Sequence, residues 1–88
     1  MLKLEVIDYK DGTSMVNHIY YNNELLASFE QPINKINFHC LDNFSSMPMT
    51  IVRYQEEDDG QFCISKIQER LFEGVTYDKD GIGILKYS

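Results

Sequence analysis

The segment from Met49 to Gly74 constrains the fold most, because it carries a hairpin signal between two apolar stretches. Residues 49–54 are rich in β-branched and aromatic side chains, which suit the half-buried surface of a sheet. Asp59-Gly60 supplies the positive φ of a tight reversal, and residues 61–64 return as the partner strand. The segment therefore predicts a hairpin, and four consecutive carboxylates, Glu56, Glu57, Asp58 and Asp59, form its tip.

The spacing of the apolar residues changes after this hairpin. Ile64, Ile67, Leu71 and Phe72 are spaced as one face of a helix, with polar residues between them. Ser65 is placed to cap the start of a helix, and Gly74 to end it in the left-handed conformation. A segment of this length is unstable as an isolated helix in water, so it must dock on other elements. We expect one short helix, residues 65–73, on the apolar face of the sheet.

Turn residues at 11–12 predict a hairpin near the start of the chain. If the turn is tight, Leu4 opposes Ile19 and Glu5 opposes His18. This pairing makes His18 a half-buried sheet histidine beside Glu5.

Asn22 and Asn23 predict a second hairpin, because asparagine tolerates positive φ. Pairing about this turn sets Tyr20 opposite Leu25 and Ile19 opposite Leu26. Two more strand signals follow, at residues 36–40 and in a last hairpin that turns at residues 80–81.

These elements predict an α+β fold in a single domain, residues 1–88. The expected architecture is a small antiparallel β-meander of five to seven strands, with the helix of residues 65–73 packed on the sheet. A small, mostly β barrel with the helix plugging one end is the alternative.

The charge of the chain limits its partners. The net charge is −6, so we expect no direct binding to nucleic-acid phosphates or to anionic membranes. Residues 1–5 are not followed by the apolar region of a signal peptide, and no apolar run approaches the ~20 residues of a membrane helix. A cytoplasmic protein with reduced cysteines is expected.

One string resembles the opening of an EF-hand calcium loop, with Asp78 and Asp80 as its first ligands. Ile82 stands where the next oxygen ligand belongs, so a β-turn is the favoured interpretation and these two aspartates are weak metal candidates. His18, His39, Cys40 and Cys63 lack zinc-site spacing, and neighbours on a strand point to opposite faces. The sequence indicates no cofactor.

Catalysis is not expected either. Cys40 with His18, or Ser45 or Ser46 with His39, are the available nucleophile and base pairs. No nucleophile elbow or phosphate-binding loop accompanies them. The sequence therefore predicts a non-enzymatic protein.

The predicted function is protein binding through the acidic tip. Glu56, Glu57, Asp58 and Asp59, with Tyr54 beside them, would dock a basic surface of a larger protein. In size and charge the chain is similar to the small acidic antagonists of phages and mobile elements, such as anti-restriction proteins. That similarity implies carboxylates that stand in for phosphates and occlude the channel of a nucleic-acid-handling protein.

The alternative is a structural or regulatory subunit, for example a homodimer. Association would then use an edge strand, or exposed tyrosines together with Phe44 and Met47.

Overall fold

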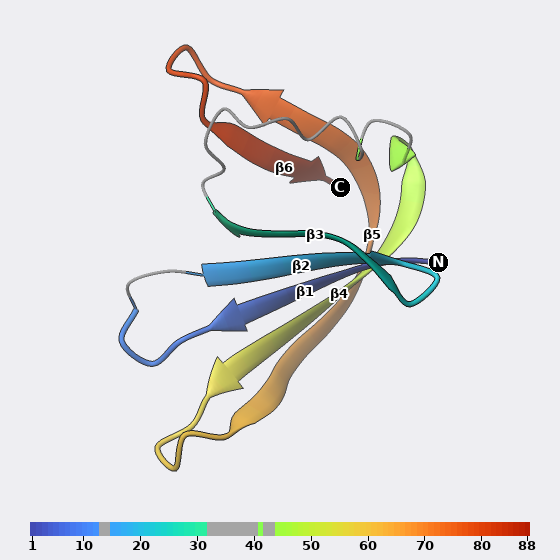
Figure 1. The fold of residues 1–88 in the computed structure, drawn as a ribbon. Helices are drawn as coiled ribbons and strands as arrows, with labels where there is room; N and C mark the ends of the chain where they lie inside the picture. Colours follow the sequence, from blue (N-terminus) through green and yellow to red (C-terminus); the bar gives the residue numbers. More distant parts are fainter. Residues whose placement is uncertain (13–14, 32–40, 42–43) are drawn as a thin grey trace.

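The computed structural model describes residues 1–12, 15–31, 41 and 44–88. Within them it forms one six-stranded sheet with no α-helix (Figure 1). No helix that could cross a membrane occurs in this part of the chain. The strands are β1 (Leu2–Asp8), β2 (Met15–Tyr21), β3 (Glu24–Gln31), β4 (Met47–Glu56), β5 (Phe62–Tyr77) and β6 (Gly83–Tyr87).

The sheet consists of two three-stranded meanders that meet at a parallel seam. The strand order is β3-β2-β1-β4-β5-β6. All neighbours are antiparallel except β1 and β4, where Leu2 lies opposite Met49 in parallel register. In Figure 1 the long β5 curves away from the hairpin it forms with β4, and its second half carries β6 back over the sheet. The result is a curled sheet with a concave side.

The core fills this concave side. Alternate residues of β1, β2 and β4 point into it because successive side chains of a strand face opposite ways. The core combines these residues with side chains from the folded-back part of the sheet; its buried members are Leu2, Leu4, Val6, Ile19, Leu41, Met49, Ile51, Phe72 and Leu85. Val75 and Tyr87 pack against them, which shows that β5 and β6 close over the other strands.

The prediction of an α+β fold with a helix at residues 65–73 is wrong. All of these residues belong to β5. The register with β4 shifts between Arg53 and Tyr54, where Ser65 is the extra residue of a β-bulge. The bulge lengthens the interval between Ile64 and Ile67 from two residues to three, so a strand acquires helix-like spacing. The barrel alternative also required this helix, and among the described residues the sheet is open, with β3 and β6 at its edges.

Gly74, which was expected to end the helix, also lies at a bulge. Gly74 has a φ of 121°, and the pairing of β5 with β6 shifts between Phe72 and Gly74. The positive φ expected at a helix end is therefore present, but it serves to bend a strand where the sheet curls.

The predicted hairpins are largely confirmed. Leu4 pairs with Ile19 and Glu5 with His18. The turn at residues 22–23 has positive φ at both asparagines, 51° and 67°. The predicted pairing of Tyr20 with Leu25 is also present.

Two predictions about strand pairing are wrong, and one predicted strand is not among the residues that the structure describes. The pairing of Ile19 with Leu26 is wrong, because a bulge moves Ala27 opposite Ile19. A pure antiparallel meander is wrong because β1 and β4 are parallel. The predicted strand at residues 36–40 lies outside the described residues.

Candidate partner-binding surface

The face of the sheet opposite the core carries a row of apolar side chains on β5. Because Met49 and Ile51 point into the core, the residues that alternate with them, and their partners on β5, point to the other face, here called the open face. Ile64 and Ile67 on this face are 56% and 59% exposed. We call this row the apolar stripe, and it consists of Phe62, Ile64, Ile67 and Leu71.

Charge is divided between the two faces of β5. Lys66 and Arg70 alternate with the apolar stripe and therefore point to the core side of the strand. Glu69 shares the open face with the stripe and accepts hydrogen bonds from the Thr50 hydroxyl at 3.0 and 3.1 Å. On β5 the open face is thus apolar and acidic, whereas the core side is basic.

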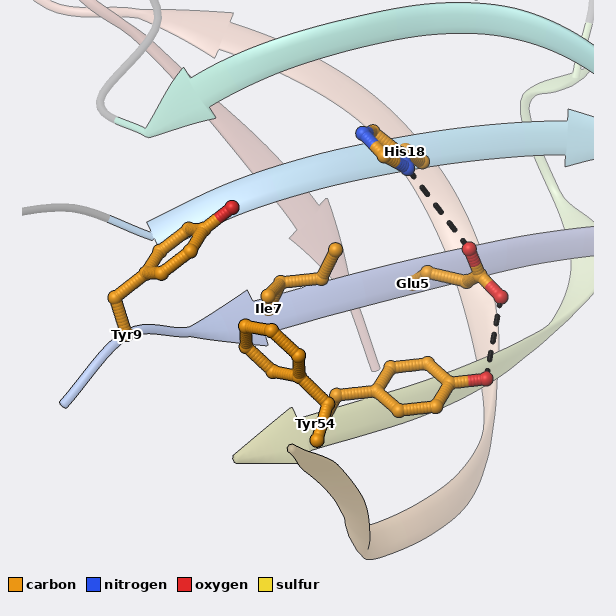
Figure 2. Close-up of a pocket in the computed structure, with 6 residues that line it drawn as sticks. Glu5, Ile7, Tyr9, His18 and Tyr54 are labelled. Atoms are coloured by element: carbon orange, nitrogen blue, oxygen red, sulfur yellow. Dashed lines mark hydrogen bonds and ion pairs between the residues drawn. The ribbon is translucent and has the colours of Figure 1, made fainter. Parts of the chain in front are cut away.

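A shallow pocket of about 280 Å³ lies on the open face near the hairpin end of the sheet. Figure 2 shows Ile7 between the rings of Tyr9 and Tyr54, with Glu5 and His18 at one side. Aromatic rings and an aliphatic side chain supply most of the wall, and its residues are Glu5, Ile7, Tyr9, His18, Tyr54 and Phe62.

The Glu5 carboxylate is the polar centre of this pocket. The Tyr54 hydroxyl donates to Glu5 Oε2 at 3.3 Å, and the Lys3 ammonium lies 3.2 Å from the same oxygen. His18 Nδ1 lies 3.9 Å from Glu5 Oε1. Local desolvation, followed by the charge of Glu5, raises the pKa of the Tyr20 phenol. The carboxylate is already matched by its own chain, so it orients its neighbours and leaves the aromatic rings as the accessible part of the pocket.

Three of the four carboxylates of the acidic tip make contacts within the chain. Glu56 accepts a hydrogen bond from the Lys10 backbone amide at 3.0 Å, and Asp58 pairs with the Lys10 ammonium. Asp59 accepts from the Gln61 amide at 3.0 Å within the turn. The two contacts with Lys10 tie the β4–β5 turn to the β1–β2 turn.

The fourth carboxylate, Glu57, acts on the thiol of Cys63. This cysteine is free and exposed. Local desolvation and then the Glu57 charge raise the pKa of its thiol. A thiol with a raised pKa is a weak nucleophile near neutral pH, because the thiolate is the reactive form.

An aromatic contact adds to the junction between the two turns. The rings of Tyr9 and Phe62 meet edge to face, with centroids 5.6 Å apart and planes at 89°. The predicted residues Glu56, Asp58 and Tyr54 are thereby brought to one end of the open face, where they border the pocket and the apolar stripe.

The other predicted site residues have structural contacts. Asp78 Oδ1 accepts from the backbone amides of Asp80 and Ile82, both at 2.9 Å, which is the geometry of an Asx turn. The described residues contain no group of three or more His, Cys, Asp or Glu side chains that could hold a metal ion. Ser45 Oγ donates to the Glu73 carbonyl at 3.3 Å, and His39 and Cys40 lie outside the described residues.

Phe44 and Met47, which the sequence suggested for association, lie at the margin of the core. Both side chains are partly buried and pack against the core. The ring of Phe44 lies 5.0 Å from that of Tyr21.

Sequence reasoning missed the apolar stripe, because it placed Ile64, Ile67 and Leu71 in the buried face of a helix. The signal that could have found them is the same spacing interpreted as a strand with one inserted residue at Ser65.

Comparison with family models, with curated proteins and with solved structures finds no match to this chain.

Proposed function

We propose that the protein is a non-enzymatic binding module that docks another protein on its open face. The observation that carries the proposal is the apolar stripe, which exposes Ile64 and Ile67 as neighbours on β5, with Leu71 beyond Glu69 on the same face. Soluble proteins rarely expose contiguous apolar surface, and such patches mark interaction sites. Ile7 and Tyr54 of the adjoining pocket extend the same surface to β1 and β4.

The carboxylates around this surface define the chemistry of the partner. Glu69 lies within the row of the stripe, between Ile67 and Leu71, and the tip residues 56–59 border the stripe at the hairpin end. Lys3, on the same face, is paired with Glu5. A matching partner surface is apolar at its centre and carries lysine or arginine at its margin, because opposite charges at a rim guide association and select partners.

In this proposal the acidic tip is part of the charged rim and does not dock a partner on its own. Glu56, Asp58 and Asp59 each hold a contact within the chain. Reversing all four charges of the tip would therefore also disturb the junction of the two turns. A test of the surface is better placed on the apolar stripe, where substitution leaves these contacts in place.

The test is capture of partners from a lysate of the source cells, read by mass spectrometry at low and high salt. The variant Ile64→Thr/Ile67→Thr makes the stripe polar and keeps β-branched side chains in the strand. The control is Ile84→Thr on β6, an isoleucine of similar exposure, 49%, outside the stripe.

We expect a partner that the wild type and the Ile84→Thr variant recover and that the stripe variant loses. Higher salt should weaken capture without abolishing it, because salt screens the charged rim and not the apolar contact. Recovery of the same partner by the stripe variant would show that the open face is not the binding surface.

A further inference from the structure

The outer edge of β5 is free over most of its length among the described residues. β6 pairs only with the part of β5 from Phe72 to Tyr77. Beyond it, Leu71 and Ser88 exchange backbone hydrogen bonds of 2.9 and 3.0 Å, and no described strand pairs outside residues 62–70 (Figure 1). Natural sheets protect their edges, because unpaired backbone groups pair readily with another strand. A free edge of this length is therefore a candidate for strand addition.

The contact with Ser88 fixes which backbone groups are available. The amide and carbonyl of Leu71 point outward, since both bond to Ser88. In an antiparallel pair, alternate residues turn these groups toward one neighbour and then the other. The amides and carbonyls of Glu69 and Ile67 therefore also point outward, whereas Gln68 directs its groups to β4.

The two sides of this edge differ in chemistry. The apolar stripe lies along the open face, and Lys66 and Arg70 lie along the core side. A strand added here would place alternate side chains next to each of these rows. Apolar residues match the stripe, and acidic residues match the two basic side chains.

We propose that this edge accepts an extended segment of a partner protein, in which apolar and acidic residues alternate, as a seventh strand of the sheet. The segment lies opposite residues 62–70, between Ser88 at one end and the β4–β5 turn at the other. Main-chain hydrogen bonds supply affinity and the alternation supplies selectivity, as in other cases of strand addition. The inference deepens the proposed function, because the added strand continues the open face toward the rest of the partner.

A second copy of the chain fits this edge poorly. Antiparallel self-pairing centred on Gln68 sets Lys66 opposite Arg70 of the second copy, and like charges in this position are destabilising. Pairing centred on Ile67 carries the start of β5 of the second copy, residues 62–63, to the position opposite Leu71, which Ser88 already occupies. These two registers favour a separate strand over a copy of β5.

The test uses blocked nine-residue synthetic peptides in which valine alternates with either glutamate or lysine. Fluorescence anisotropy measures the binding of each peptide to the intact protein. We expect the glutamate peptide to bind at least tenfold more tightly than the lysine peptide. Amide exchange measured by NMR should slow at Ile67 and Glu69 when the glutamate peptide is bound, because their outward amides become hydrogen-bonded.

A matched pair of variants separates strand addition from side-chain contact. Ile67→Pro removes an outward amide that β4 does not use, a position at which an edge strand tolerates proline. Ile67→Thr keeps that amide and also removes the apolar side chain. We expect Ile67→Pro to weaken binding of the glutamate peptide at least tenfold and Ile67→Thr less than threefold, with circular dichroism checking that both variants fold.

Three results would overturn the inference. The first is equal binding of the glutamate and lysine peptides, or no binding of the glutamate peptide. The second is that the two Ile67 variants weaken peptide binding equally. The third is a dimer, detected by sedimentation, that Ile67→Pro dissociates, since the occupant would then be a second copy. In each of these cases, capture of a partner through the apolar stripe could still succeed. The proposed function is therefore tested independently of strand addition.

Discussion

A comparison of Ile67 with Phe72 tests the strand assignment of β5 most directly. Helical spacing places both residues in the core, whereas the bulged strand places them on opposite faces. Phe72 is 1% exposed and belongs to the core, and Ile67 is 59% exposed on the open face. The perturbations are Phe72→Ala and Ile67→Thr.

The structure sets different magnitudes for the two changes. Truncation of a buried phenylalanine to alanine costs about 3–5 kcal/mol of the free energy of unfolding, a large share of the roughly 4–13 kcal/mol typical of a domain of this size. Complete burial of an isoleucine side chain contributes about 1.5–3 kcal/mol. Since Ile67 is only about two fifths covered and threonine keeps its β-branch, Ile67→Thr should cost less than about 1 kcal/mol.

Urea unfolding followed by circular dichroism measures both costs by linear extrapolation. Ile84→Thr serves as the control for an exposed isoleucine in a strand. A loss of more than about 2 kcal/mol in Ile67→Thr, or one equal to that of Phe72→Ala, would refute the reasoning, because Ile67 would then be a core residue.

Three further predictions concern the bulge, the core and the free thiol. Gly74→Ala should lower stability by about 1–3 kcal/mol in thermal unfolding, because alanine is strained at a φ of 121°; an unchanged melting temperature would contradict this. Asn17→Val should raise the unfolding free energy by about 1 kcal/mol, because the amide oxygen of Asn17 is buried and has no hydrogen-bond partner among the described residues; a loss of stability would show that the bond from its Nδ2 to the Met15 carbonyl, 3.1 Å, matters more. Glu57→Gln should speed the reaction of Cys63 with a disulfide reagent near neutral pH, since loss of the carboxylate lowers the thiol pKa and increases the thiolate fraction; an unchanged rate would exclude this influence.

The hairpins of the first meander were accessible from the sequence because their determinants are local. The turn at residues 22–23 requires positive φ, and asparagine supplies it. The register that follows from the first turn pairs Leu4 with Ile19, as the structure does. The predicted pairing of β2 with β3 failed at the bulge between Ile19 and Tyr20, because the residues of the turn do not show that a residue is inserted farther along the strand.

The remainder of the fold depends on contacts that a local pattern does not contain. The partner of β1 on its second side is β4, and residues 9–46 separate these strands. The bulge at Ser65 gave β5 the spacing of a helix, and the bulge at Gly74 gave it the glycine of a helix end. The candidate site was predictable where charge marks it, at Glu56 and Asp58. The apolar stripe was not, because its exposure depends on the face to which each strand residue turns.

The parallel seam between β1 and β4 also determines the order in which the chain can fold. Each meander closes through neighbours in sequence, so the hairpins of β1–β2–β3 and of β4–β5–β6 can form early and independently. The seam joins residues such as Leu2 and Met49, which are far apart in the chain, and its closure carries the largest loop entropy of the sheet. We therefore expect docking of the two halves to be the slow step of folding, and substitutions at this seam to slow folding more than substitutions in either hairpin.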